Sequence, residues 1–155
     1  MKLDSIDIKI LEILQKDSDQ QTAQLAEQVG LSATPCWRRV QRLRDAGVIT
    51  RNVALVDPRK VNVGVTVFVF VRTSTHTDEW FGRLKATVDL IPEVVEFYRM
   101  SGDIDYLLRI VVPDIAAYDK VYKRLTANTN LYDVSSSFAM EEIKFTTALP
   151  LSFVG

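Results

Sequence analysis

GLSATPCWRRVQRLRDAGVI, residues 30–49, is the stretch of this chain that decides its fold. At 100° per residue, a helix over this stretch has an apolar arc and a polar arc on opposite sides. The apolar arc, which is suited to packing, contains Cys36, Val40 and Leu43. The polar arc, which is suited to reading a groove, contains Thr34, Arg38, Gln41 and Arg42. The Ser32 hydroxyl is expected to cap the start of the helix, and Gly47 is expected to end it.

Positive charge is concentrated on this helix. Residues 34–51 contain five arginines and one acid, so their net charge is +4, whereas the whole chain carries −1. The arginines are Arg38, Arg39, Arg42, Arg44 and Arg51. One interpretation of these arginines is an ordinary solvent-exposed face of a surface helix, which often has this composition. A local basic patch on a nearly neutral chain is also what a face that meets phosphates requires.

The flanking segments favour the second interpretation. Residues 3–17, LDSIDIKILEILQKD, have helical spacing of apolar side chains, with Asp4 and Asp7 as a capping pair. Residues 22–30, TAQLAEQVG, predict a second helix that Gly30 turns into the third. Alternation over residues 48–56, VITRNVALV, predicts a short strand or wing. The pattern predicts a winged helix-turn-helix that binds double-stranded DNA through its last helix.

Composition excludes several other classes. The chain has 155 residues, 47% hydrophobic and 25% charged, which suits two small globular cores. No run approaches the 18 apolar residues of a membrane span, and the start, MKLDSIDIKI, lacks a signal-peptide pattern, so we expect a cytoplasmic protein without membrane contact. Cys36 is expected to be a buried apolar residue, and the lone His76 supports no metal site or catalytic triad. We expect no catalytic residue, no metal ligand and no cofactor.

The second half of the chain predicts a different domain. We expect a DNA-binding domain over residues 1–56, a linker over 57–64, DPRKVNVG, and an effector and oligomerisation domain over 65–155. In this last domain the patterns predict strands over 65–72, 94–100, 105–112 and 134–151, and helices over 78–91 and 113–128. This order, βαββαβ, is that of a ferredoxin-like sandwich, so the expected fold class is α+β.

The predicted strands are apolar on both faces. Val67 and Val69 face one way while Phe68 and Phe70 face the other, and the strand over 105–112 repeats this pattern. Two helices cover only one face of a four-stranded sheet, so a monomer would expose an apolar face. We therefore expect a homodimer, with one DNA-binding helix in each subunit.

The turn SGDID, residues 101–105, is a candidate ligand site. Gly102 permits close approach of a backbone, while Asp103 and Asp105 place carboxylates at a sheet end. An ordinary hairpin turn explains the same residues. Three serines, 135–137, interrupt the predicted last strand. If they meet the turn across a subunit contact, the two segments can hold a zwitterion, with Asp105 beside its ammonium group.

Several motifs together resemble the leucine-responsive regulatory protein / AsnC (Lrp/AsnC) family of transcription regulators. They are LDSIDIKIL, GLSATPCWRRVQRL, SGDIDYLL, VPDIAAY and MEEIK, and they are distributed over nearly the whole chain. SGDIDYLL with MEEIK is most similar to the leucine-responsive branch.

The resemblance implies an amino-acid effector, with leucine or methionine as candidates, and dimers that assemble into a ring of four, an octamer. It implies DNA contacts from Ser32, Thr34, Pro35, Arg38, Arg39 and Arg42, to which the polar arc adds Gln41. Arg39 lies beside the apolar seam, so a structural salt bridge is an equal alternative for it. The positions that match the family's effector site are Met100, Gly102 and Asp105, with Ser136 as a secondary assignment. The candidate turn adds Ser101 and Asp103 to the expected effector site.

These features predict a DNA-binding transcriptional regulator whose assembly and DNA binding respond to a free amino acid. An architectural DNA-binding protein without effector response is the first alternative. A small enzyme that uses Asp103 and Asp105 is the second, although no nucleophile or cofactor loop accompanies these carboxylates.

Overall fold

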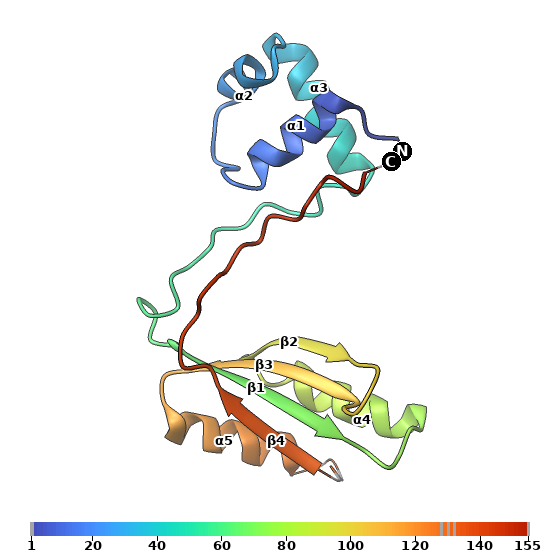
Figure 1. Ribbon diagram of the computed structural model, residues 1–155, viewed down its shortest axis with the longest axis vertical. Helices are drawn as coiled ribbons and strands as arrows, with labels where there is room; N and C mark the ends of the chain where they lie inside the picture. The colour runs from blue at the N-terminus through green and yellow to red at the C-terminus, as the bar shows by residue number, and fades with distance from the viewer. Residues whose placement is uncertain (1, 128, 130, 132, 155) are drawn as a thin grey trace. The chain divides into compact units, whose positions relative to one another are not determined.

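A computed structural model describes residues 2–127, 129, 131 and 133–154 and divides the chain into two compact units (Figure 1). The first unit combines Met1–Ala54 with Lys144–Gly155, and the second is Leu55–Ile143. Within the described residues, no helix is long and apolar enough to cross a membrane.

Three helices build the first unit: α1 (Ser5–Leu14), α2 (Thr22–Val29) and α3 (Ala33–Asp45). The predicted capping pair is confirmed: the Asp4 carboxylate accepts from the backbone N–H groups of Ile6 and Asp7, and the Asp7 carboxylate accepts from the Asp4 N–H. Gly30, at φ +71°, makes the left-handed turn between α2 and α3. The core of the unit consists of Ile10, Leu11, Leu25, Ala26, Val29, Cys36, Val40 and Leu43.

Two local expectations about the first unit are wrong. Ser32 stands at the start of α3, but its hydroxyl makes no cap hydrogen bond, and only its carbonyl accepts, from the Cys36 N–H. The strand expected over residues 48–56 does not form, because no described strand runs beside it to supply hydrogen-bond partners.

The last residues of the chain pack on the first unit. Leu151 lies partly buried against the three-helix core, and Leu149 is hydrogen-bonded to Gln15, the residue that follows α1. The structure therefore differs from the predicted domain boundaries, which placed all residues from 65 to 155 in the second domain. Sequence order alone does not show that a terminal segment returns to the first core.

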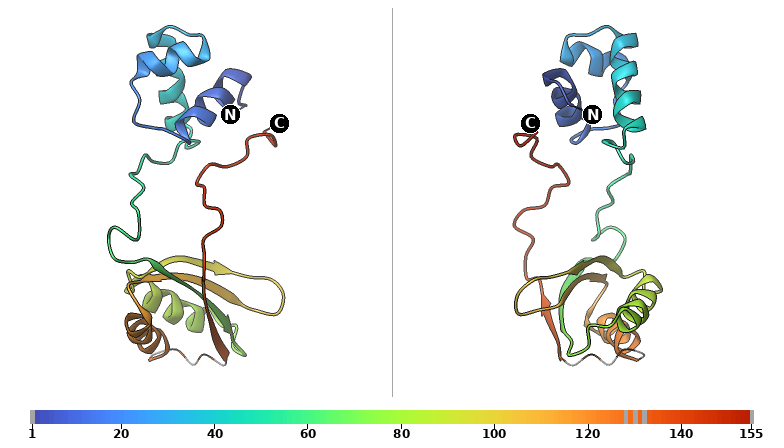
Figure 2. Two further views of the ribbon diagram at one scale, coloured as in Figure 1. Left: turned by 60° about the vertical axis from the view of Figure 1, so that its left-hand side comes forward. Right: turned by 90° about the vertical axis from the view of Figure 1, so that its right-hand side faces the viewer.

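The second unit has the predicted βαββαβ order. Its elements are β1 (Val65–Arg72), α4 (Asp78–Asp89), β2 (Val94–Arg99), β3 (Tyr106–Val112), α5 (Ile115–Thr126) and β4 (Asp133–Phe138). The strands form an antiparallel sheet in the order β2-β3-β1-β4. Both helices lie on one face of this sheet (Figure 2). Asn128, the expected end of the second helix, lies outside the described residues.

The two faces of the sheet differ in burial as the alternation predicts. Val67, Val69 and Val71 of β1 are fully buried beneath the helices, together with Leu108 and Ile110 of β3. The opposite face carries partly exposed side chains, among them Thr66, Phe68, Phe70, Leu107 and Val111. The helices therefore leave an apolar sheet face uncovered.

The last strand is shorter than expected. β4 ends at Phe138 rather than at residue 151. Its final bond to β1 is donated by the Ala139 N–H to the Thr66 carbonyl, close to where β1 itself begins at Val65. Beyond that point β1 offers no further backbone partner, so the apolar residues that follow cannot continue the ladder.

Candidate nucleic-acid interface and ligand site

The outer face of α3 presents the polar residues that were predicted to meet DNA. Ser32, Thr34, Pro35 and Arg38 are exposed, and Gln41 is partly exposed. Cys36, Val40 and Leu43 are buried on the opposite side, so the predicted division of the helix into two faces is confirmed for these residues. Trp37 is 53% exposed beside this face.

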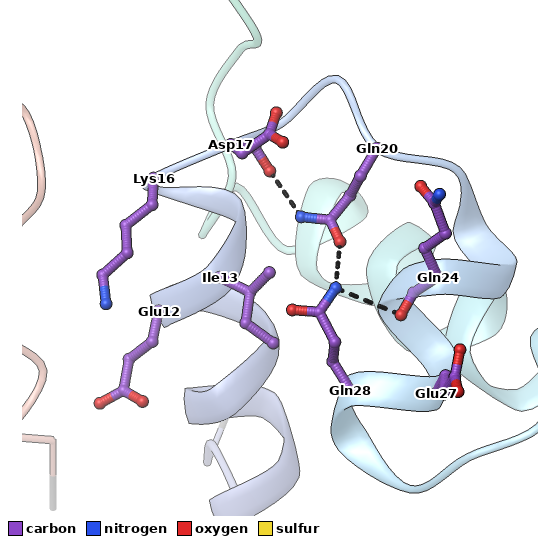
Figure 3. Close-up of a pocket in the computed structure, with 8 residues that line it drawn as sticks. All are labelled: Glu12, Ile13, Lys16, Asp17, Gln20, Gln24, Glu27 and Gln28. Carbon is purple, nitrogen blue, oxygen red and sulfur yellow. Dashed lines mark hydrogen bonds between the residues drawn. The ribbon is translucent and has the colours of Figure 1, made fainter.

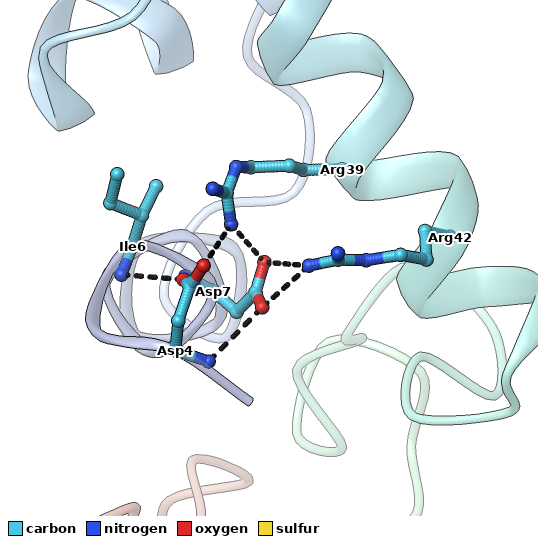
Figure 4. A network of polar contacts seen from close by, with 5 residues as sticks. All are labelled: Asp4, Ile6, Asp7, Arg39 and Arg42. Carbon is cyan, nitrogen blue, oxygen red and sulfur yellow. Dashed lines mark hydrogen bonds and ion pairs between the residues drawn. The ribbon is translucent and has the colours of Figure 1, made fainter. Parts of the chain in front are cut away.

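Two arginines of α3 do not point freely outward. Arg39 Nη1 lies 2.6 Å from Asp4 Oδ2 and 2.9 Å from Asp7 Oδ1 (Figure 4). Arg42 Nη2 lies 2.8 and 2.7 Å from the two oxygens of Asp7. We call Asp4, Asp7, Arg39 and Arg42 the α1–α3 ion network. It joins the first helix to the third, and its central carboxylate, that of Asp7, is fully buried.

This network changes the charge assigned to the DNA face. For Arg39 the structure supports the structural salt bridge rather than a free DNA contact. Arg42 is exposed, as its predicted outward position requires, but its guanidinium is paired with Asp7. By contrast, no carboxylate in the described part of the chain pairs with Arg38, Arg44 or Arg51. Arg44 and Arg51 also line a hollow of about 350 Å³ beside the end of α3.

Hydrogen bonds with the arginine also affect Asp4. The N–H of Asp7 and the guanidinium of Arg39 lower the pKa of the Asp4 carboxyl from 3.8 to about 2. Hydrogen bonds to the carboxylates of Asp4 and Asp7 raise the pKa of Arg39. The two groups therefore stay charged, and paired, over the whole ordinary pH range.

A polar groove of about 650 Å³ lies between α1 and α2 (Figure 3). Gln28 Nε2 donates to Gln20 Oε1 at 2.6 Å, and Gln20 Nε2 donates to the Asp17 carbonyl at 2.9 Å. The remaining lining residues are Glu12, Ile13, Lys16, Gln24 and Glu27. None of the residues predicted to bind DNA or effector lies in this groove.

In the second unit, the turn between β2 and β3 has a defined geometry. The Met100 N–H donates to the Asp105 carbonyl at 2.8 Å, which closes the turn. Gly102 has φ +105°, a conformation that favours glycine. Ser101, Gly102 and Asp103 are exposed, and the Met100 side chain is 39% exposed. Five of the six predicted effector positions therefore lie together at one end of the sheet.

The two carboxylate oxygens of Asp105 have different surroundings. Its Oδ2 accepts from the Thr73 N–H at 2.8 Å, while its Oδ1 lies 3.9 Å from Nε2 of His76. The carboxylate is 30% exposed, so a ligand cation can reach it. Thr73 and His76 follow β1, and sequence reasoning did not connect them with the turn.

Arg72 is a second residue that the sequence analysis missed. Its Nε donates to the Asp103 carbonyl at 2.8 Å, and its Nη1 lies 3.1 Å from Asp133 Oδ2 of β4. The guanidinium is 52% exposed. One side chain thus ties the turn to two strands and adds positive charge beside Asp105. Only the position of Arg72 at the end of β1, opposite Asp133 at the start of β4, indicates this role.

The structure does not bring Ser136 to the turn within one chain. Ser136 lies opposite Val69 on one side of β1, whereas Asp105 precedes Tyr106 on the other side. The hydroxyl of Ser136 is hydrogen-bonded to the hydroxyl of Tyr118, on the helix-covered face. A meeting across a subunit contact stays a prediction. In the described residues, no group of three or more acidic, histidine or cysteine side chains is placed to hold a metal ion.

Comparison with known proteins accounts for both units. A model for winged helix-turn-helix DNA-binding domains matches residues 3–50, and a model for the Lrp/AsnC ligand binding domain matches residues 66–149. This chain belongs to the Lrp/AsnC family. It is a DNA-binding transcriptional regulator and not an enzyme, and the resemblance inferred from the motifs is confirmed.

Similar proteins cover nearly the whole chain. The DNA-binding transcriptional activator DecR of Escherichia coli is 49% identical over 150 residues, covering 96% of this chain and 99% of its own length. The glutamate uptake regulatory protein of Zymomonas mobilis is also 49% identical, covering 97% and 92%. An AsnC family regulator from Agrobacterium tumefaciens is 62% identical with a TM-score of 0.93, covering 96% and 97%. A Neisseria meningitidis regulator, solved in complex with L-Met, is 37% identical with a TM-score of 0.92, covering 97% and 98%.

Proposed function

We propose that this regulator contacts DNA with the outer face of α3 and changes its DNA binding when a free amino acid binds at the turn of residues 100–105. The observation that carries the proposal is the juxtaposition of Asp105 and Arg72 at one sheet end, in the unit that matches a ligand-binding family. A negatively charged carboxylate and a positively charged guanidinium close together suit a zwitterion, which carries one charge of each sign.

Each charge of an amino acid has a partner at this site. The Oδ1 of Asp105 is the oxygen that the Thr73 N–H does not use, and we assign it to the ammonium group. The exposed backbone and hydroxyl of Ser101, beside Gly102, are assigned to the carboxylate, with the charge of Arg72 nearby. The apolar side chain of Met100 is available to an apolar side chain of the ligand.

Leucine and methionine are the amino acids that we propose to test first. The similar regulator from Neisseria meningitidis was solved with L-Met, which supports an apolar unbranched candidate. Leucine follows from the similarity of SGDIDYLL and MEEIK to the leucine-responsive branch. One relative named above is a glutamate uptake regulatory protein and another was solved with L-Met, so the identity of the ligand must be measured for this chain.

On the DNA side, we assign Thr34, Arg38 and Gln41 to the groove, with Ser32 and Pro35 near the phosphates at the start of α3. We propose a dimer that covers the apolar sheet face, and four dimers in the complete assembly. The related regulators come from bacteria, so we place the protein in the cytoplasm, where bacterial DNA lies.

Calorimetric titration of each of the twenty amino acids into the full chain tests the effector. We expect one or a few apolar amino acids to bind, and the Asp105→Asn variant to lose this binding because it removes the partner of the ammonium group. Glu141→Gln is the control, because Glu141 is exposed in the same unit and pairs with no described cation. An unchanged affinity in Asp105→Asn contradicts the site, and no binding by any amino acid favours the architectural alternative.

A further inference from the structure

The α1–α3 ion network suggests a role beyond holding two helices together. We propose that Asp7 limits the affinity of this regulator for DNA of any sequence, by keeping Arg39 and Arg42 bound to α1 and away from phosphates. Asp7 is then a specificity-determining residue that lies outside the helix that reads the DNA.

The bonding of Asp7 shows how firmly the arginines are held. A carboxylate offers about four acceptor positions on its two oxygens. In Asp7, Oδ1 accepts from Arg39 Nη1 and Arg42 Nη2, while Oδ2 accepts from Arg42 Nη2 and the Asp4 N–H. Its acceptor capacity is therefore filled. Because its side chain has no exposed surface, water does not compete for these bonds.

A DNA phosphate must compete with this buried carboxylate. Arg39 is only 25% exposed, and both of its contacts use the same nitrogen, Nη1. Arg42 is 50% exposed, but its Nη2 bridges both oxygens of Asp7. Moving one guanidinium to a phosphate removes part of the pairing of a buried carboxylate, and moving both leaves the Asp7 charge unpaired, which is strongly unfavourable.

The network also removes net charge from the DNA-binding surface. Asp4, Asp7, Arg39 and Arg42 sum to zero, so they attract phosphates weakly at distances beyond direct contact. The positive charge left near α3 is that of Arg38, Arg44 and Arg51. Binding that depends only on phosphates is therefore weaker than the five arginines of the sequence suggest. Contacts to base edges then account for a larger share of the affinity for the correct site.

The Asp7→Asn variant tests this proposal, because asparagine keeps the shape and removes the charge. Its affinity for a mixed-sequence duplex of about 40 base pairs is measured in full-length protein over a range of salt from about 50 to 200 mM. We expect binding at low salt to be tighter by roughly threefold or more. The slope of log affinity against log salt becomes steeper by about 1 to 2, since each additional phosphate contact adds about 0.9.

A matched control separates the network from a general change in charge. Glu12→Gln removes one negative charge from the same helix, and Glu12 is exposed and pairs with no cation in the described residues. Its slope is expected to stay at the wild-type value. If Asp7→Asn is folded by circular dichroism and its slope equals that of Glu12→Gln, or is shallower than that of the wild type, the proposal is wrong.

If the Asp7 variant does not fold, Asp4→Asn provides the test. Asp4 is half exposed, and asparagine is also a good cap, so α1 is preserved. This change removes one of the two acids that hold Arg39. The slope is then expected to steepen by up to about 0.9. An unchanged slope in folded Asp4→Asn overturns the proposal.

Discussion

Gln15, at the end of α1, and Leu149 are joined by two hydrogen bonds, although they lie 134 positions apart in the chain. The Leu149 N–H donates to Gln15 Oε1 at 2.7 Å, and Gln15 Nε2 donates to the Leu149 carbonyl at 3.2 Å. A side-chain amide thus pairs with the backbone as a neighbouring strand would. Two residues further on, Leu151 packs against the three-helix core. The DNA-binding unit therefore contains residues from both ends of the chain.

The C-terminal contact predicts that a change near the end of the chain destabilises the unit built mainly from its first 54 residues. Leu151→Ala is expected to lower the free energy of unfolding of the three-helix unit by about 1 to 2 kcal/mol, because a partly buried leucine loses less than a fully buried one. Residue-resolved amide hydrogen exchange of α1, α2 and α3 measures the stability of this unit separately from that of the second. Leu149→Ala is the control, since its side chain is 72% exposed and its backbone bonds to Gln15 are retained. Equal effects of the two changes would show that Leu151 packing is unimportant.

Arg38 is the arginine that we expect to contribute most to DNA binding. It is exposed on the outer face of α3, and no described acid pairs with it. Arg38→Ala should weaken binding to DNA by about 1 to 3 kcal/mol while leaving the helices folded. The slope against salt should become shallower by about 0.9 where the contact is to a phosphate. Arg83→Ala, an exposed arginine of α4, serves as the control. Undiminished affinity would remove Arg38 from the interface.

The pKa of Asp4 predicts how acid affects the first unit. It is about 2 in the folded protein, against 3.8 ordinarily, so folding favours the charged form. The resulting stability is present above about pH 4 and is lost as the pH falls through about 2. We expect the wild type to melt above Asp4→Asn near neutral pH, and this difference to shrink between about pH 4 and pH 2.

The control for this titration is Asp19→Asn. The Asp19 carboxylate is exposed and makes no ion pair within the described ranges, so its melting difference from the wild type should not follow the same pH course. A difference between wild type and Asp4→Asn that stays constant down to about pH 2 would mean that the Arg39 and Asp7 contacts do not hold the Asp4 charge.

Local sequence signals predicted most of the elements. The helical period placed Cys36, Val40 and Leu43 on the buried side of α3, and strand alternation placed Val67 and Val69 beneath the helices. Capping by Asp4 and the left-handed turn at Gly30 also depend on nearby residues. These features were predictable because their physical causes act over a few positions.

The candidate ligand site was only partly predictable. Residues 100–105 form a continuous turn, so their proximity follows from the sequence. Arg72 and His76 reach that turn because β1 pairs with β3, and this register is a property of the sheet. Ser136 is hydrogen-bonded to Tyr118 of α5, on the helix-covered face of the sheet, and not to the turn. Spacing along the chain does not contain this information.

The sequence by itself determined the two kinds of domain, the outward residues of α3 and the family to which the chain belongs. Only the tertiary structure decided which arginines are free, because the partners of Arg39 and Arg42 lie more than 30 positions earlier in the chain. It also decided that β4 ends at Phe138 and that Leu151 returns to the first core. The physical reason is the same in each case. Helix period and capping act between neighbours, whereas ion pairs, strand ladders and core contacts depend on which distant segments folding brings together.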